Sequence, residues 1–167
     1  GVSHYSYTYD GSDTLLSFDN IFQVKLQGYN GITYALADNT DITGATLDTT
    51  VAQTIALTAG VDTLGGSSIV TFTANSASYS TSDNLYGGAG NNALNLSGGG
   101  TFNIGSNVHG VQNIVLDNNQ YALTVTSSGV TNINAAAITD YSHSFSVDAS
   151  AVNQGLTLSG GAGENTL

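Results

Sequence analysis

The sequence contains no cysteine, proline, tryptophan or methionine, and Lys25 is its single basic residue. Without cysteine the chain forms no disulfide framework and has no thiolate for catalysis or metal binding. The formal net charge of −11 argues against nucleic acid and anionic membrane surfaces as partners, because binding phosphate needs lysine and arginine. No apolar run approaches the ~20 residues of a membrane-spanning helix, so we expect no membrane insertion.

The residues that are present favour a folded domain rich in small polar side chains. Hydrophobic residues make up 40% of the 167 positions, which is enough for a buried core. Only 8% are charged, against ~25% in an average globular domain. Threonine, serine, asparagine and 21 glycines supply the polarity instead. These residues suit the exposed faces and corners of stacked strands.

From residue 52 onward an apolar–x–apolar pattern recurs, which predicts short strands with one buried face. Between Leu94 and Val125 the repeats follow at roughly ten residues, as expected for two strands on each solenoid coil of about twenty. We therefore predict an all-β fold, with a β-solenoid or β-roll-like stack of right-handed parallel coils over roughly 52–167. The predicted inward pairs are Ile55/Leu57, Val70/Phe72, Leu94/Leu96, Phe102/Ile104, Ile114/Leu116, Leu123/Val125, Phe145/Val147 and Leu156/Leu158.

The first 45 residues are more aromatic and predict ordinary antiparallel strands. We expect two units: residues 1–45, a small antiparallel segment that caps the solenoid or ends a preceding module, and residues 46–167, a repeat module that continues beyond the fragment. Alternation gives the expected strand faces in the first unit, which are Tyr5/Tyr7/Tyr9, Phe22/Val24/Leu26 and Tyr34/Leu36.

Two glycine-rich octads are near copies of each other: GGAGNNAL at residues 87–94 and GGAGENTL at residues 160–167. Glycine supplies turn dihedrals that other residues resist, and the apolar residue at the end begins an inward-facing strand. The octads resemble the calcium-binding nonapeptide G-G-x-G-x-D-x-U-x of RTX (repeats-in-toxin) proteins. The sixth position is aspartate in that family, but here it is Asn92 and Asn165.

Two longer segments, TIALTAGVDTL at 54–64 and SVDASAVNQGLTLSGGAGENTL at 146–167, are similar to repetitive regions of RTX-type bacterial S-layer proteins and large secreted adhesins. The resemblance covers roughly residues 52–167. It implies an extracellular, type I-secreted, calcium-stabilised protein that builds a surface layer or mediates attachment.

The resemblance also implies where calcium would bind. Carried over by position, the calcium turns fall on Gly88, Gly90, Asn92, Gly161, Gly163 and Asn165. Because Ca²⁺ prefers six to eight oxygen ligands, a neutral asparagine oxygen in place of a carboxylate predicts that each octad binds calcium more weakly than the family's turn or not at all. The alternative is a glycine turn in which asparagine bonds to its own backbone. Asp83 with Asn91 and Asn92 is the strongest single candidate, because it adds a full charge beside the turn.

Other acidic turns are metal candidates with the same alternative, an ordinary Asx turn. They are Asp10/Asp13, Asp38/Asp41 and Asp62. His4, His109 and His143 are scattered without metal-ligand spacing. There is no nucleophile elbow, P-loop or H-E-x-x-H motif, so we expect no enzyme. A pair of carboxylates from distant segments is the remaining catalytic alternative.

These observations predict a non-catalytic structural module at a bacterial cell surface, in an S-layer or fibre, that binds copies of itself through exposed strand edges. The expected cofactor is Ca²⁺, and cell-surface polysaccharide is a second candidate partner. The alternatives are a carbohydrate-binding adhesin module and an accessory repeat module of a secreted polysaccharide-active enzyme. In the adhesin interpretation the sugar platform would be Tyr5, Tyr7, Tyr9 and Tyr29.

Overall fold

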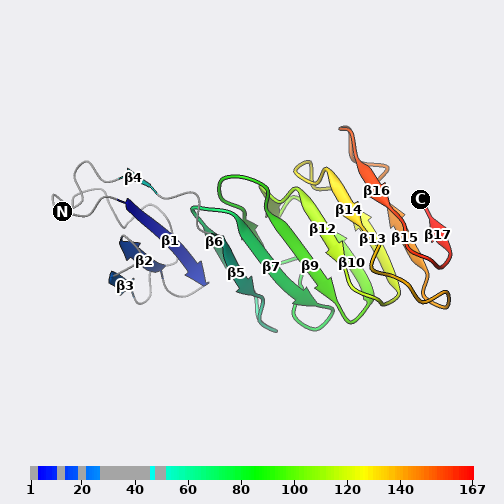
Figure 1. Ribbon diagram of the computed structural model, residues 1–167, viewed down its shortest axis with the longest axis horizontal. Coiled ribbons are helices and arrows are strands. Elements are labelled where there is room, and N and C mark those ends of the chain that lie inside the picture. The colour runs from blue at the N-terminus through cyan, green and yellow to red at the C-terminus, as the bar shows by residue number, and fades with distance from the viewer. Residues whose placement is uncertain (1–3, 11–13, 19–21, 27–45, 48–51) are drawn as a thin grey trace.

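The computed structural model describes residues 4–10, 14–18, 22–26, 46–47 and 52–167, and in these parts of the chain it contains strands and turns but no helix. The described residues contain seventeen strands in three sheets. The chain winds repeatedly through the sheets, so that strands far apart in sequence lie side by side (Figure 1). The predicted all-β solenoid is confirmed.

The long sheet is entirely parallel and runs the length of the solenoid. In spatial order it contains β5 (Gln53–Ala56), β7 (Val70–Asn75), β9 (Ala93–Ser97), β12 (Asn113–Leu116), β14 (Asn132–Asn134) and β16 (Thr157–Ser159). One inward row passes through all six strands in register: Ile55, Phe72, Leu94, Ile114, Ile133 and Leu158. Successive members of this row are 17 to 25 residues apart, which brackets the predicted coil of about twenty.

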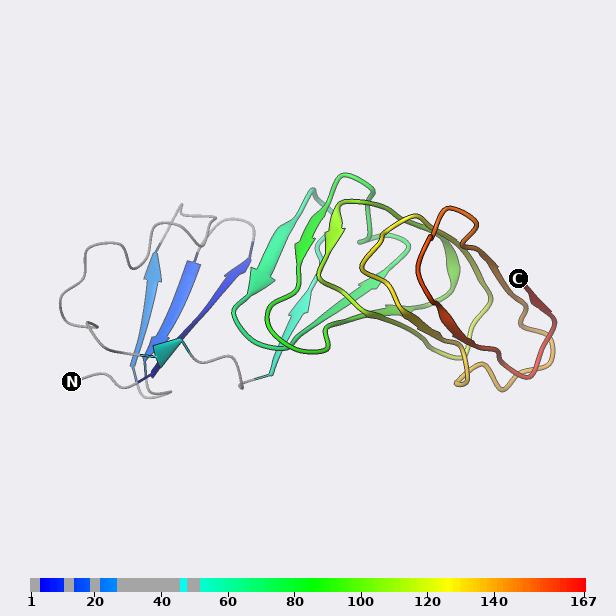
Figure 2. The ribbon, with the colours of Figure 1, turned by 90° about the horizontal axis from the view of Figure 1, so that it is seen from above.

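The short sheet forms a second side of the solenoid and is also parallel. It contains β10 (Gly100–Ile104), β13 (Tyr121–Val125), β15 (Phe145–Asp148) and β17 (Asn165–Thr166). Phe102, Leu123 and Val147 are in register and buried. Seen from above, the chain passes from one sheet to the other by short corners (Figure 2).

The cap sheet combines the third side of the solenoid with the N-terminal strands. Its path is β11 (Val108–His109), β8 (Asn84–Tyr86), β6 (Thr63–Gly66), β1 (His4–Asp10), β2 (Thr14–Phe18) and β3 (Phe22–Leu26), and β4 (Thr46–Leu47) pairs with β1. The pairing of β6, β8 and β11 is parallel, whereas β1 runs antiparallel to both β6 and β2. The predicted antiparallel strands around Tyr5 and Val24 are therefore present, and β1 joins them to the solenoid by its pairing with β6.

This third side was not predicted. Each of its solenoid strands places a single apolar residue inward, namely Leu64, Leu85 and Val108. One apolar residue between polar or glycine neighbours produces no alternation for a period-two search to detect. The division at residue 45 stays a prediction.

The core is an aliphatic and phenylalanine column enclosed by the coils. Of the predicted inward pairs, the seven from Ile55/Leu57 to Phe145/Val147 are buried, while Leu156 and Leu158 pack partly buried against the same cluster. Burying such side chains stabilises by about 1.5–3 kcal/mol each. The predicted strand with Tyr34 and Leu36 lies outside the described residues.

Candidate functional site: the glycine turns and polar corners

The first octad, residues 87–94, connects β8 of the cap sheet to β9 of the long sheet. Gly90 adopts a φ of 86°, a left-handed conformation that residues other than glycine resist. Gly88 lies so close to the preceding coil that a Cβ atom there would overlap the backbone oxygen of Ser68. The octad is therefore a turn pressed against the coil before it.

Asn92 closes this turn from inside and is fully buried. Its Oδ1 accepts a hydrogen bond from the backbone N–H of Val70 at 2.7 Å. Its Nδ2 donates to the carbonyl oxygens of Gly88 at 2.9 Å, Gly90 at 3.3 Å and Gly110 at 2.8 Å. Because Val70 lies one coil before and Gly110 one coil after, a single side chain joins three coils.

The second octad, residues 160–167, follows β16 and includes β17; it repeats the hydrogen bonds that the asparagine makes within the turn. The Nδ2 atom of Asn165 donates to the carbonyl oxygens of Gly161 at 3.1 Å and Gly163 at 2.8 Å. Its Oδ1 accepts from the backbone N–H of Gly161 at 3.1 Å. Unlike Asn92, this side chain is exposed.

In both octads the carbonyl oxygens at the second and fourth positions face an amide nitrogen. An amide N–H is a donor and repels a cation, whereas Ca²⁺ needs oxygen ligands. The donor set at Asn92 and Asn165 thus does not fit a calcium ion in this arrangement. It matches the alternative, a glycine turn closed by asparagine.

Asp83 belongs to a different structure, which we call the polar column: Asp62, Asp83 and Asn107, at the entries to β6, β8 and β11. Asp83 is fully buried, and its Oδ1 accepts from the backbone N–H of Asp62 at 3.0 Å. Its Oδ2 accepts from the N–H of Ser80 at 2.7 Å. The Nδ2 of Asn107 donates to the Asp83 carbonyl oxygen at 2.7 Å. The bonds from Asp62 and Ser80 tie the Asp83 carboxyl group to the backbone of two coils. Asn91, the residue predicted to bind a metal together with Asp83, is exposed.

Asp62 is buried in the same column and is bonded locally as well. Its Oδ2 accepts from the N–H of Thr58 at 2.8 Å, and its Oδ1 accepts from the Thr58 hydroxyl at 2.8 Å. This is the Asx-turn alternative for Asp62. Asp10 ends β1 in register with Leu64; Asp13, Asp38, Asp41 and Tyr29 lie outside the described residues.

The three histidines belong to separate segments of the fold. His4 lies in β1, the ring of His109 stacks on Tyr86 with centroids 4.8 Å apart, and His143 lies 4.0 Å from Asp140. Within the described ranges no three side chains of His, Asp or Glu come together as a metal-binding group. Nor does any helix in those ranges have the length and apolar character to span a membrane.

Sequence reasoning missed a polar corner around Asp117, between β12 and β13. The buried hydroxyl of Tyr121 donates to Asp117 Oδ1 at 2.5 Å, and the N–H of Gly98 donates to Oδ2 at 3.0 Å. Asn119 Nδ2 also donates to Oδ1, at 2.9 Å. Tyr121 continues the alternation of Leu123 and Val125 by two residues, and this signal could have revealed it as buried.

These bonds determine the ionisation of the corner. Burial on its own would raise the pKa of Asp117, but the hydrogen bonds from Tyr121, Asn119 and Gly98 outweigh it and lower the pKa. Burial, together with the bond to Asp117, raises the pKa of Tyr121 to about 12. At neutral pH the pair is therefore a carboxylate that accepts from a neutral phenol.

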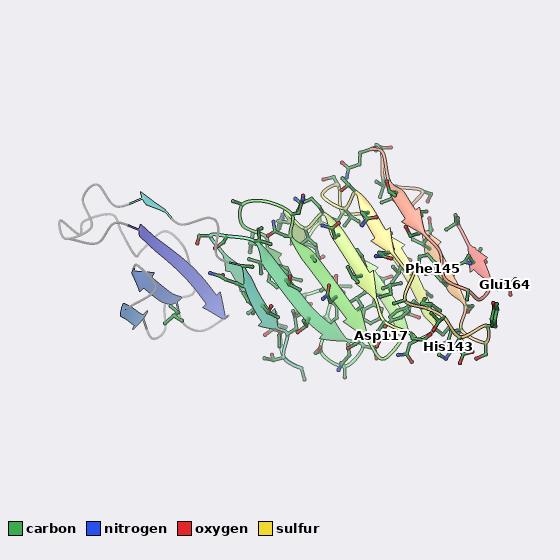
Figure 3. All side chains as sticks on the ribbon, viewed as in Figure 1. Asp117, His143, Phe145 and Glu164 are labelled. Carbon is green, nitrogen blue, oxygen red and sulfur yellow. The ribbon has the colours of Figure 1, made fainter. Side chains whose placement is uncertain are left out.

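An open depression adjoins this corner. It is lined by the glycine run 98–100 and by His143, which lies near Asp117 (Figure 3). The Nδ1 atom of His143 is buried without a hydrogen-bond partner. No nucleophile paired with a base lines the depression, which consists of Gly98, Gly99, Gly100, Thr101, Asn119, Gln120, Ala122 and His143.

Comparison with known proteins adds no relative. The chain matches no protein-family model, no curated protein and no solved structure.

Proposed function

We propose that this chain is a non-catalytic structural module of an extracellular bacterial surface protein, in an S-layer or fibre, and that it associates with copies of itself. The observation that carries the proposal is how the buried polar side chains are used. Asp62, Asp83 and Asn92 all bond to backbone groups of their own or neighbouring coils. Asp83 and Asn92 join neighbouring coils, and Asp62 holds the turn before β6. Buried polar side chains that fix the coils in place are what a load-carrying scaffold requires.

The edge strands of the two parallel ladders support the assembly part of the proposal. β16 and β17 are the last strands in the order of the long and short sheets. Edge strands present backbone N–H and C=O groups that another strand can pair with. A further coil, from the same polypeptide or from a second copy, would extend both ladders in the same parallel register.

The resemblance of the octads to RTX-type repeats supports the cell-surface location and type I secretion in this proposal. The small share of charged residues and the many small polar residues suit a long, repetitive exterior. Calcium enters the proposal only away from the two octads, at acidic side chains such as Asp10 and Asp13. The adhesin alternative depends on Tyr5, Tyr7, Tyr9 and Tyr29, whose side chains are outside the described part of the chain.

Lysines on the edge strands should prevent association. In the double variant Thr157→Lys/Thr166→Lys both changes fall on exposed positions of β16 and β17. A lysine on an edge strand opposes pairing, because its ammonium group would lose hydration against the added strand. We expect the wild-type chain to show a mass that grows from micromolar to millimolar concentration in sedimentation velocity. The edge variant should remain monomeric.

The matched control is Ala122→Lys/Thr124→Lys, which adds the same charge at exposed positions of β13, an interior strand of the short sheet. It should associate like the wild type. A wild-type chain that is monomeric at every concentration would refute the assembly proposal, as would equal loss of association in both variants.

A further inference from the structure

We propose that Asn92 and Asn165 close the two glycine turns in place of a cation, so that calcium contributes nothing to either turn. This inference does not depend on self-association and concerns what holds each corner. It runs opposite to what the resemblance of the octads to RTX repeats implies. Three features of the turns carry it.

The first feature is the orientation of the Asn92 carboxamide. The N–H of Val70 can only donate, so the atom facing it at 2.7 Å must be Oδ1. The carbonyl oxygens of Gly88, Gly90 and Gly110 can only accept, so the atom facing them must be Nδ2. The two ends of the carboxamide therefore give the same orientation. In a flipped carboxamide the oxygen would face the three carbonyl oxygens, and the nitrogen would face the N–H of Val70.

The second feature is where the nitrogen lies. Carbonyl oxygens of two coils converge on the Asn92 Nδ2 atom, at 2.8 to 3.3 Å. A cation held by those oxygens would have to occupy this space, because backbone carbonyls are the ligands that the turn offers. The side chain is fully buried, so the nitrogen cannot move out without breaking the bond to Val70.

The third feature is repetition. Asn165 directs its Nδ2 at the carbonyls of Gly161 and Gly163, the same two octad positions as Gly88 and Gly90. The two copies lie in different corners of the solenoid, and Asn92 is buried whereas Asn165 is exposed. The shared geometry therefore follows from the octad sequence and not from one local environment.

Calcium binding and amide closure predict different behaviour of the same protons. For Asn92 to offer oxygen to a cation, its carboxamide must rotate and release the N–H of Val70. The test is NMR-detected hydrogen exchange of the Asn92 side-chain NH₂ and the Val70 amide, on the wild-type chain, in excess calcium chloride and in chelator. We expect both groups to be protected equally in the two conditions.

Thermal unfolding of matched variants provides the second measurement. Asn92→Asp puts a carboxylate oxygen against three carbonyls, and an uncompensated buried charge should lower Tm by about 10 °C or more in chelator. Asn91→Asp adds the same charge at the exposed neighbour and should change Tm by no more than about 2 °C.

A calcium-dependent loss of Val70 protection, with new Asn92 NH₂ resonances, would overturn the proposal even if Asn92→Asp fails to fold. So would an Asn92→Asp variant as stable as Asn91→Asp in chelator. If calcium raises the wild-type Tm while the Asn92 and Asn165 NH₂ groups are unchanged, the cation binds elsewhere and the proposal for these turns stands. None of these outcomes bears on whether copies of the chain associate.

Discussion

Replacing Asp83 with alanine is expected to lower the free energy of unfolding by about 3 kcal/mol, because one buried and one partly buried N–H group lose their acceptor. These are the N–H groups of Asp62 and Ser80, at 3.0 and 2.7 Å from the carboxyl oxygens. With Asp83 fully buried, water cannot take the place of the carboxyl group. Urea denaturation followed by circular dichroism would measure the loss.

Asp148→Ala is the matched control for this prediction. Asp148 also accepts from a backbone N–H, that of Ser150 at 3.0 Å, but it is exposed at the end of β15. Solvent can satisfy the freed group there, so the expected loss is at most about 1 kcal/mol. Equal losses in the two variants would show that the polar column does not join the coils.

Replacing Gly88 with alanine is expected to destabilise the protein by about 3 kcal/mol, since the new methyl group overlaps the backbone oxygen of Ser68. Backbone cannot rotate away as a flexible side chain can, so relief requires the turn to move off the preceding coil. That movement would also lengthen the bond from Asn92 to the Gly88 carbonyl. The same denaturation experiment would report the change.

Gly155→Ala provides the contrast, because a Cβ atom at that position meets no other atom within 4 Å. Its expected effect lies within about 1 kcal/mol in either direction, and reduced freedom of the unfolded chain makes a small gain possible. If Gly88→Ala lowers the free energy of unfolding no more than Gly155→Ala does, the first octad does not pack closely on the preceding coil.

The inward-facing residues of the two longer sides could be predicted from alternation alone. Pairs such as Phe72 with Val70 and Ile114 with Leu116 are buried as expected, because strands of four to six residues contain two inward positions. The third side could not be found in this way, since β8 and β11 contain one inward residue each.

A different signal was present for that side. Asp62-Thr63-Leu64 and Asp83-Asn84-Leu85 share the pattern D-x-L, 21 residues apart. The structure pairs these segments in register. A search for short repeated polar–apolar sequence patterns, in place of apolar alternation, would have placed both aspartates at equivalent corners.

The role of Asn92 illustrates what a motif leaves open. The octad correctly indicates a tight turn with glycines where the backbone needs them, as the φ of Gly90 shows. What the sixth residue does depends on the atoms that face it from other coils, here Val70 and Gly110. Residues 18 to 22 positions away cannot be assigned as its partners before the register of the coils is known.

The central claim is that successive coils stack in one parallel register, and spin-label distances along a single row test it most directly. Thr71, Asn113, Asn132 and Thr157 occupy one such row, through Ala93. With no native cysteine, cysteine pairs at these positions can be labelled cleanly. From Thr71 the distances should grow by about 4.8 Å for each strand crossed. Distances that fail to increase in this order would contradict the solenoid.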